Sequence, residues 1–565
     1  MDLKTQYSRR YFLPEDDFSD PETIRKAYAR LEEMPVDTQD QAAEWLEAWN
    51  EVMSAISERV ARAYFDMTSN TKDPDAAKEY GRLANEVIPL SEELDESMKK
   101  RFLSLPEDWV PKEYAIARKN AQWAIELFTK ENLPLLSKEM EFRQRYQQIS
   151  GGWETEFDGK KVTPSMLRPY LKKPDRQVRE KAWRASIGMH LEDKGNLDDL
   201  FDKMLANRNQ MAKNSGFDNF VDYRFKSMLR LSYGPKDTKA FRDAIHKYVV
   251  PAAEKIMARR KNKMGLDTMR PWDTSADPDG AEPPVVYKDL DELKEKAARV
   301  LKSIDPEFEE AFWLMNEMGY LDLENRPGKA PGAYSNDFAE ERMAMVFGNA
   351  VGTSDDFDTL MHESGHAIHT LSCRHLPLLA RSYPLEFAEV ASMSLELLAR
   401  PYWHMVYTPE DEKRIGIEQL EGNLRFLPFM AMLDEFQDWV YTHPEGADRQ
   451  ARADYWKGLA AKYMPYVDYS GMDDELELGW QYLHVFEVPL YYVEYGVAQV
   501  GAMQVFANSL ENYSQAVKEY KYALTLGTTV GLPELFEAAG VKFVLKHPEQ
   551  LERVTNAAMK LIGLA

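Results

Sequence analysis

Apolar residues recur every three or four positions along most of the chain, which is the spacing of one face of an α-helix. The pattern is clear over residues 42–67, 75–94 and 113–132, and it resumes in PDRQVREKAWRAS from residue 174. These stretches are rich in Ala, Glu, Lys, Arg and Leu, which are strong helix formers. The pattern therefore predicts a mainly α-helical fold.

Two short stretches break the helical pattern and favour strands. GGWETEFDGKKVT (residues 151–163) alternates polar and apolar residues around Asp158-Gly159, a pair typical of a tight hairpin turn. MAMVFGNA (residues 343–350) follows a segment rich in Gly and Pro and indicates a short strand. We expect a small β-sheet or hairpin among the helices.

The second of these stretches is a candidate for substrate binding if it forms an edge strand. An extended peptide can pair its backbone with such a strand without demanding particular side chains. Gly348 would permit the close approach of another backbone, and Phe347, Gly348 and Asn349 are the candidate substrate-binding residues. The alternative is an ordinary structural strand.

Composition and charge narrow the class of protein. The formal net charge of −24 over 565 residues argues against nucleic-acid binding, which needs basic patches. The charge is either a solvated acidic surface or a field that attracts cationic peptides. The single cysteine allows no intrachain disulfide, and neither a signal peptide nor an apolar run of about 18 residues is present. We expect a cytoplasmic protein that does not bind a membrane.

The stretch MHESGH (residues 361–366) holds two histidines four residues apart, with a glutamate directly after the first. On a helix such histidines share one face about 6 Å apart, so His362 and His366 can hold one zinc ion. Glu363 is rotated by about 100° and can reach a metal-bound water, whose proton it can accept. A polar helix face without metal is the alternative, and the apolar flanks of the motif make it the weaker one.

Catalytic zinc needs a third protein ligand, and the sequence offers several candidates. His369 lies on the same face but about 10.5 Å along the axis from the first histidine, so one metal cannot easily bind all three. The longer H-E-x-x-H-x-x-G-x-x-H pattern fails, because position 369 is His and position 372 is Ser. A predicted helix over residues 383–403 offers carboxylates instead, at Glu386, Glu389 and Glu396. The last two share a face, so one could bind metal while the other orients a ligand histidine; spacing alone does not choose between them.

The stretch LHVFEVPLYYVEYG (residues 483–496) gathers one histidine and three tyrosines, His484, Tyr491, Tyr492 and Tyr495. Such side chains can donate hydrogen bonds to the negative oxygen of a tetrahedral intermediate. Taken by itself, the stretch fits better an aromatic helix face packed in a core.

HESGHAIH followed by FAEVASMSLELL resembles the thimet oligopeptidase/oligoendopeptidase F family of zinc metallopeptidases, and most closely its compact Pz-peptidase-like members. The resemblance extends upstream through RPGKAPGAYS and MVFGNAVGTSDDFDTLMHE, and downstream through GWQYLHVFEVPLYYVEYGVAQVGA. It covers roughly residue 151 to the C-terminus. It therefore implies a catalytic region over residues 151–565 after an N-terminal helical region over residues 1–150, with lobes that can interleave.

The resemblance also implies roles for individual residues. The glutamate of the family's F-x-E-x-x-S segment, which is its third metal ligand, corresponds to Glu389. Glu396 corresponds to an acidic residue that would contact a metal ligand and not the metal itself. The family's substrate-gripping residues correspond to His484, Tyr492 and Tyr495, although the spacing is one residue shorter than in thimet-type members and leaves Tyr491 as a rival. The implied architecture is a two-lobed helical body around a deep channel, with the small sheet beside the metal-binding helix.

The sequence therefore predicts an oligoendopeptidase with one Zn²⁺ per chain, held by His362, His366 and Glu389, that cleaves short unfolded peptides. Glu363 would activate the water and later pass its proton to the leaving amine. Two alternatives remain open: a helical zinc metallocarboxypeptidase, and a peptide-binding scaffold that has lost its metal.

Overall fold

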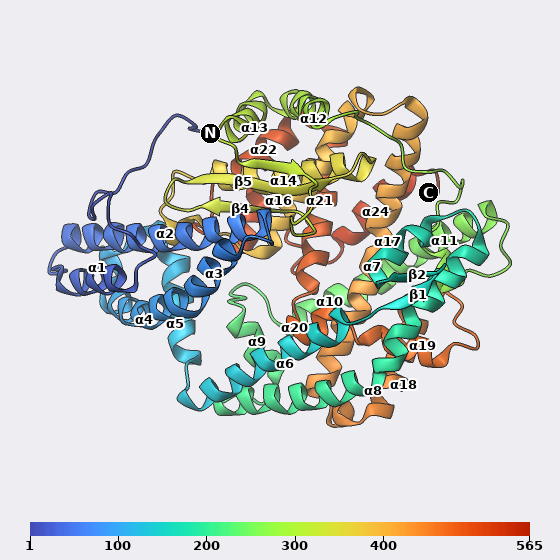
Figure 1. Ribbon diagram of the computed structural model, residues 1–565, viewed down its shortest axis with the longest axis horizontal. Helices are drawn as coiled ribbons and strands as arrows, with labels where there is room; N and C mark the ends of the chain where they lie inside the picture. Colours follow the sequence, from blue (N-terminus) through green and yellow to red (C-terminus); the bar gives the residue numbers. More distant parts are fainter. The chain divides into compact units, whose positions relative to one another are not determined.

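The computed structural model describes residues 1–565 (Figure 1). The chain divides into two compact units that each combine three segments. Unit 1 consists of Met1–Glu126, Pro283–Lys413 and Gly501–Phe543, and unit 2 of Leu127–Glu282, Arg414–Val500 and Val544–Ala565. The chain thus alternates between the units. The first division falls between residues 126 and 127. The extent of the catalytic region stays a prediction.

Unit 1 contains most of the sheet structure and the helix of the histidine motif. Its elements are α1 (Pro21–Glu33), α2 (Gln39–Ser69), α3 (Pro74–Arg82), α4 (Ile88–Ser104), α5 (Ala115–Leu127, whose last residue belongs to unit 2), α12 (Leu290–Ile304), α13 (Pro306–Glu317), β3 (Leu321–Glu324), β4 (Tyr334–Phe338), β5 (Met343–Ala350), α14 (Ser354–Ser372), α15 (Leu378–Arg381), α16 (Leu385–Ala399), α22 (Tyr513–Ala523) and α23 (Leu532–Ala538).

Unit 2 is almost entirely helical. Its elements are α6 (Leu133–Gly151), β1 (Thr155–Phe157), β2 (Lys160–Val162), α7 (Pro164–Leu167), α8 (Arg176–Asn214), α9 (Phe220–Ser227), α10 (Pro235–Ala244), α11 (Val250–Lys263), α18 (Arg449–Tyr463), α19 (Asp473–Glu477), α20 (Leu483–Glu487) and α24 (Gln550–Leu561). The unit boundaries near residues 413 and 500 fall inside α17 (Pro409–Thr442) and α21 (Val493–Glu511). The predicted mainly α-helical fold is confirmed. No helix combines the length and apolar character that a membrane span requires.

The hairpin predicted at Asp158-Gly159 is also confirmed. Strands β1 and β2 pair antiparallel, with Phe157 opposite Lys160. Both turn residues have positive φ, 51° at Asp158 and 73° at Gly159. A two-residue turn of this kind needs positive φ at both positions, which Asp-Gly adopts at low cost.

Strand β5 lies in the middle of a three-stranded sheet of order β3-β5-β4, so the expectation that it forms an edge strand is wrong. It pairs parallel with β3 and antiparallel with β4, with Val346 opposite Leu321 on one side and Ser335 on the other. Its residues 343–348 are all buried. A continuous apolar run of this kind is typical of a strand covered on both faces, and a substrate cannot pair with it where both neighbours are present. The edges of the sheet are β3 and β4.

The N-terminal helices of unit 1 form a core built on α2. Trp45 and Trp49 stack with ring centres 5.4 Å apart, and Phe102 of α4 meets Trp49 edge-on at 5.8 Å. Helix α2 also packs against β4. The sheet is therefore contacted by α2 as well as by α14, which packs on β4 and β5.

Candidate metal centre

Helix α14, which carries the histidine motif, begins at a well-defined cap. The Asp356 carboxylate accepts hydrogen bonds from the backbone amides of Gly352 and Thr353, both at 2.8 Å, and from the Tyr287 hydroxyl at 2.6 Å. An acidic side chain in the first turn satisfies amides that have no partner within the helix. Gly352 has φ of 97°, a conformation that favours glycine. The cap fixes where the helix starts and therefore which side chains face its neighbours.

Gly365 lets α16 approach the motif closely. A Cβ atom at this position would lie 2.5 Å from the Cα of Ser392 and 3.1 Å from the backbone oxygen of Ala391. The Tyr520 hydroxyl donates to that same oxygen at 2.8 Å and holds α16 from another side. Glycine at this helical position is costly by propensity, but it allows the two helices to pack backbone against backbone.

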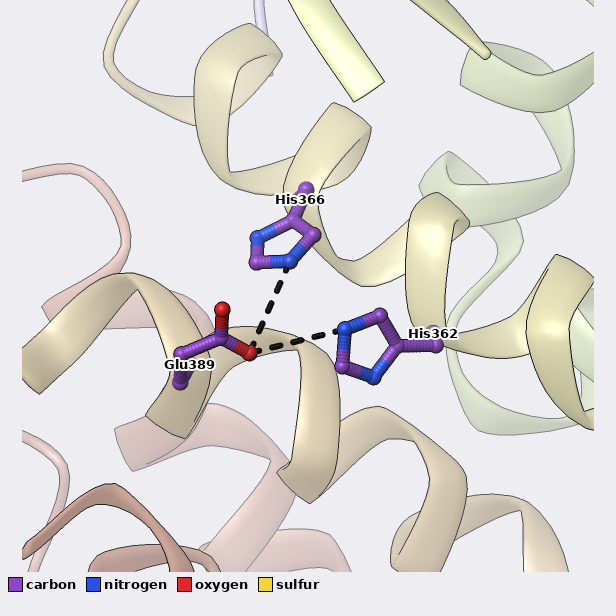
Figure 2. A group of neighbouring side chains, drawn as sticks. All are labelled: His362, His366 and Glu389. Atoms are coloured by element: carbon purple, nitrogen blue, oxygen red, sulfur yellow. Dashed lines mark ion pairs between the residues drawn. The ribbon is translucent and has the colours of Figure 1, made fainter. Parts of the chain in front are cut away.

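The close packing brings His362, His366 and Glu389 together (Figure 2). The Nε2 atoms of His362 and His366 lie 3.4 and 3.7 Å from one oxygen of the Glu389 carboxylate. One ligand atom from each residue can be chosen so that all three lie within 4.8 Å of one another. Tetrahedral zinc with bonds of about 2.1 Å separates its ligand atoms by roughly 3.4 Å. This set of two imidazoles and one carboxylate therefore fits a zinc ion.

Glu396 lies on the far side of His362 from this group. Its carboxylate is 2.6 Å from Nδ1 of His362. A hydrogen bond at Nδ1 fixes the orientation of the ring and leaves Nε2 free to bind a metal. Of the two carboxylates that spacing alone left open, the structure places Glu389 with the ring Nε2 atoms and Glu396 behind.

Glu363 is 7 % exposed and is not a member of the three-residue group. Burial raises the pKa of its carboxyl to about 7; the charge of His362 opposes that rise, and that of Glu389 adds to it. The backbone amide of Ser335 on β4 hydrogen-bonds this carboxylate. A carboxylate with a pKa near neutrality suits proton transfer at neutral pH.

The two histidines of the motif have opposite shifts in pKa. Burial lowers the pKa of His362, but the hydrogen bond to Glu396 and the charges of Glu396 and Glu389 outweigh burial and raise it to about 9. Burial and the charge of His362 lower the pKa of His366 to about 3. The site therefore concentrates negative charge around His362, which a bound cation would neutralise.

His369 does not join the group. It is fully buried, and its ring stacks on Tyr383 with centres 3.6 Å apart and meets Phe387 edge-on at 5.9 Å. Burial lowers its pKa to about 3. It belongs to the packing between α14 and the segment that leads into α16.

A cavity of about 270 Å³ lies beside Glu363. Phe347, Gly348 and Asn349, the candidate substrate-binding residues, all line it, together with Gly332 and Ala333 from the segment before β4. Asn349 donates hydrogen bonds to the backbone oxygens of Ala330 and Gly332 at 2.9 and 2.8 Å and fixes that segment. These residues thus form one wall of a cavity next to the candidate base, although β5 is not an edge strand.

In unit 2, the histidine and three tyrosines of the aromatic stretch form one cluster. The His484 ring centre lies 4.6 Å from that of Tyr492, 5.9 Å from Tyr495 and 6.3 Å from Tyr491. Tyr492 is 8 % exposed, and its ring packs edge-on against Phe426, whereas Tyr491 and Tyr495 are partly exposed. All three tyrosines therefore lie in one cluster with His484, and Tyr491 and Tyr495 are more exposed than Tyr492.

Three arginines hold the backbone of this segment, and two of them, Arg208 and Arg230, are buried. Arg208 donates to the backbone oxygens of Val485, at 2.8 Å, and Phe486; Arg224 donates to that of Pro489 at 3.2 Å, and Arg230 to that of Leu490 at 2.6 Å. Leu490 has φ of 63°, an uncommon and strained conformation for leucine. These contacts explain how a segment broken by a proline keeps its aromatic side chains together.

Three residues that shape the centre were not predicted from the sequence: Gly365, Ser335 and Asp356. Gly365 had a signal, because a glycine inside a helical pattern often has a packing reason. Asp356 fits the capping signature before an apolar run. The contact of Ser335 with Glu363 had no signal, since it depends on how β4 docks against α14.

The comparison with protein families decides the assignment. The sequence pattern of the peptidase family M3 matches residues 169–553. The chain belongs to peptidase family M3. Among solved structures, that of Pz peptidase A with an inhibitor is 25 % identical to this M3 chain and superposes with a TM-score of 0.86 over 100 % of this chain and 99 % of the other. Oligoendopeptidase F from Enterococcus faecium shares the fold at 17 % identity, with a TM-score of 0.61 over 96 % of this chain and 98 % of the other.

Two curated relatives of this M3 chain are oligoendopeptidases from Lactococcus lactis. An oligoendopeptidase F homolog of strain IL1403 is 22 % identical over 314 residues, and the chromosomal oligoendopeptidase F of subspecies cremoris is 30 % identical over 154 residues. The matches cover 53 % and 27 % of this chain. The chain spans 49 % and 23 % of the length of these relatives.

Proposed function

We propose that this M3 protein is a zinc-dependent oligoendopeptidase that hydrolyses internal bonds of short unfolded peptides. The observation that carries the proposal is the convergence of His362, His366 and Glu389 beside the buried carboxylate of Glu363. The likeness to Pz peptidase A over the whole chain supports it. A location in the cytoplasm and one zinc ion per chain are parts of the same proposal.

The residues of unit 1 would each have a separate role in peptide hydrolysis. A zinc ion bound by the three-residue group would supply a water of lowered pKa and polarise the scissile carbonyl. Glu363 accepts the proton of the attacking water on its carboxylate and passes it to the leaving amine nitrogen. Glu396 keeps Nε2 of His362 directed at the site. The cavity beside Glu363 would take a substrate side chain next to the cut.

The cluster in unit 2 would supply neutral donors for the negative charge of the tetrahedral intermediate. Burial lowers the pKa of His484, so that it is neutral at neutral pH. Tyr495 and Tyr491 are the partly exposed tyrosines of the cluster, and the ring of Tyr495 packs against those of Tyr491 and Tyr492. Each donor of this type typically contributes a factor of about 100 or more to turnover.

The test measures metal content and the products of an internally quenched peptide of about ten residues. We expect about one zinc per chain and cleavage at internal bonds, abolished by chelator and restored by zinc. Release of single C-terminal residues would favour the carboxypeptidase. A protein without metal or turnover would favour the peptide-binding scaffold.

The decisive variant is Glu363→Gln. We expect it to keep its zinc and to lose at least about a thousandfold in kcat, because the amide cannot accept a proton. Glu317→Gln on the exposed face of α13 is the matched control and keeps wild-type turnover. Near-normal turnover of the Glu363 variant would contradict the mechanism.

A further inference from the structure

A second cavity in unit 1, of about 540 Å³, lies among the N-terminal helices and β4. Its volume is within the range of about 300–1,000 Å³ typical of ligand sites. Its walls are mostly apolar and aromatic, with two carboxylates.

The charged side chains that line this cavity are all negative. Glu92 and Asp95 both line it, and no lysine, arginine or histidine does. Asp95 already accepts a hydrogen bond from Nε1 of Trp49 at 2.7 Å and pairs with Lys99 at 3.0 Å. Glu92 is exposed and has no ion-pair partner. Glu92 is therefore the carboxylate left to receive a cation.

The walls suit the stem and the head of a long basic side chain. Ile56, Val60 and Ile88 offer apolar surface, along which lysine and arginine methylenes pack while the charged head reaches a polar group. Tyr64 and Tyr80 lie with ring centres 5.4 Å apart, and tyrosine faces attract cations. A neutral apolar side chain would use the walls but would leave the carboxylate without a partner.

The cavity is connected to the candidate active site through β4. Asn336 lines the cavity, and its neighbour Ser335 hydrogen-bonds Glu363 through the backbone. Ala333, three residues before Asn336, lines the first cavity with Glu363. Three residues of a strand span about 10 Å. An extended peptide beside β4 would therefore reach the second cavity a few residues from the bond cleaved near Glu363.

A row of aromatic rings also joins the two cavities. Tyr64, which lines the second cavity, lies 5.4 Å from Tyr334 on β4. Tyr334 in turn stacks on Phe347 at 4.8 Å, and Phe347 lines the first cavity. A chain of ring contacts thus runs from a residue that lines one cavity to a residue that lines the other.

We propose that this second cavity is a specificity subsite for a lysine or arginine side chain of the substrate, two to four residues from the scissile bond. The inference rests on the proposed peptidase function. Glu92 is the specificity-determining residue, and the rings of Tyr64 and Tyr80 form the wall beside the bound cation.

The test uses quenched peptides of one sequence that carry lysine, norleucine or glutamate at each position up to four residues from the cut. Norleucine keeps the apolar stem and removes the charge. We expect the ratio of kcat/KM for lysine over norleucine to be about five- to tenfold at one of these positions, from one ion pair and one cation–π contact. In Glu92→Gln the ratio falls close to one, and in Glu92→Lys glutamate becomes the preferred residue.

Glu93→Gln is the matched control, since Glu93 is the exposed neighbour of Glu92 on α4 and does not line the cavity. It keeps the wild-type ratio. Equal ratios near one at every position in the wild type, or an unchanged ratio in Glu92→Gln, would overturn the subsite.

A binding measurement separates this inference from the proposed function. The affinities of the lysine and norleucine peptides are measured by fluorescence on Glu363→Gln, with and without Glu92→Gln. If no peptide is cleaved by the wild type but lysine-dependent binding requires Glu92, the peptidase proposal fails and the cavity remains a site for basic side chains. If peptides are cleaved but binding ignores Glu92, the subsite alone fails.

Discussion

Several single residues at the centre meet opposing energetic requirements. Gly365 lowers helix propensity but permits the helix contact that delivers Glu389. Glu363 is buried, which raises its pKa, yet it must be ionised to act as a base. His362 is held by a carboxylate that favours its protonated form, yet it must be neutral to bind metal. A cation in the site would relieve the last two conflicts.

The pKa of Glu363 predicts the acid side of the pH–activity profile. The carboxyl has a pKa of about 7 without metal, and a nearby cation lowers it. Because the base form is the ionised one, kcat/KM should rise with pH and level off at or below about pH 7. The profile is measured with zinc in excess from pH 5 to 9. An activity that falls as pH rises from 5 to 7 would contradict Glu363 as the base.

The Gly365→Ala variant tests the helix contact. The added methyl would overlap the backbone of Ser392, which cannot move as a side chain can. We expect α16 to shift, zinc affinity to drop at least about tenfold, and the free energy of unfolding to fall by about 1–3 kcal/mol. Isothermal titration with zinc and denaturant unfolding measure both.

The control is Gly188→Ala in α8, where an added methyl meets nothing within 4 Å. It should leave zinc affinity unchanged and raise stability by up to about 1 kcal/mol through helix propensity. Equal behaviour of the two variants would show that the contact at Gly365 does not position Glu389.

At the scale of elements, the sheet and the aromatic segment show what pairing and packing add to a local pattern. Strand β5 was predicted as a strand, but its place in the middle of the sheet depends on β3 and β4. Neither of these strands was predicted, because the sequence around them is rich in Gly and Pro. The segment from α20 to α21 keeps its shape through contacts with α8 and α9, distant in sequence. The local sequence predicts neither the position of β5 in the sheet nor the shape of the aromatic segment, because both depend on residues that are distant in sequence.

Arg208→Lys tests how far the arginines position the aromatic segment. Lysine keeps the charge near Glu139 but cannot donate to Val485 and Phe486 from one planar group. We expect kcat to fall about tenfold while the zinc content stays at the wild-type level, because the candidate metal ligands are in unit 1. Steady-state kinetics and metal analysis measure the two effects.

Arg449→Lys is the matched control, because Arg449 pairs with Asp199 and Asp202 on the exposed surface of the same unit. Exposed pairs contribute little, so this variant should retain wild-type kcat. Loss of zinc from the Arg208 variant, or unchanged turnover, would contradict a positioning role.

At the scale of the whole molecule, the net charge of −24 should act on the approach of substrates. A field of this sign attracts cationic peptides, and salt screens it over about 10 Å at 0.1 M. We expect kcat/KM for a peptide of charge +3 to fall severalfold between about 0.02 and 0.3 M salt, and that for a neutral peptide to change little. If kcat/KM depended on salt equally for both peptides, the negative charge would be a solvated surface feature without effect on substrate approach.

The sequence by itself determined the helical class, the hairpin, the candidate metal-binding motif and the family resemblance. The motif depends on residues close together along the chain, because His362, Glu363 and His366 lie within two turns of one helix, and the resemblance is a set of such short motifs. The Asp-Gly turn is local in the same sense. Local spacing is enough where one element carries the whole feature.

Only the tertiary structure decided the rest. It placed Glu389 rather than Glu396 or His369 with the two histidines, because Gly365 lets two helices meet closely. It put β5 in the centre of its sheet, and it gathered the second cavity from helices and a strand more than 240 residues apart in sequence. Such features depend on which surfaces pack against each other, and the spacing of residues within one element does not contain that information.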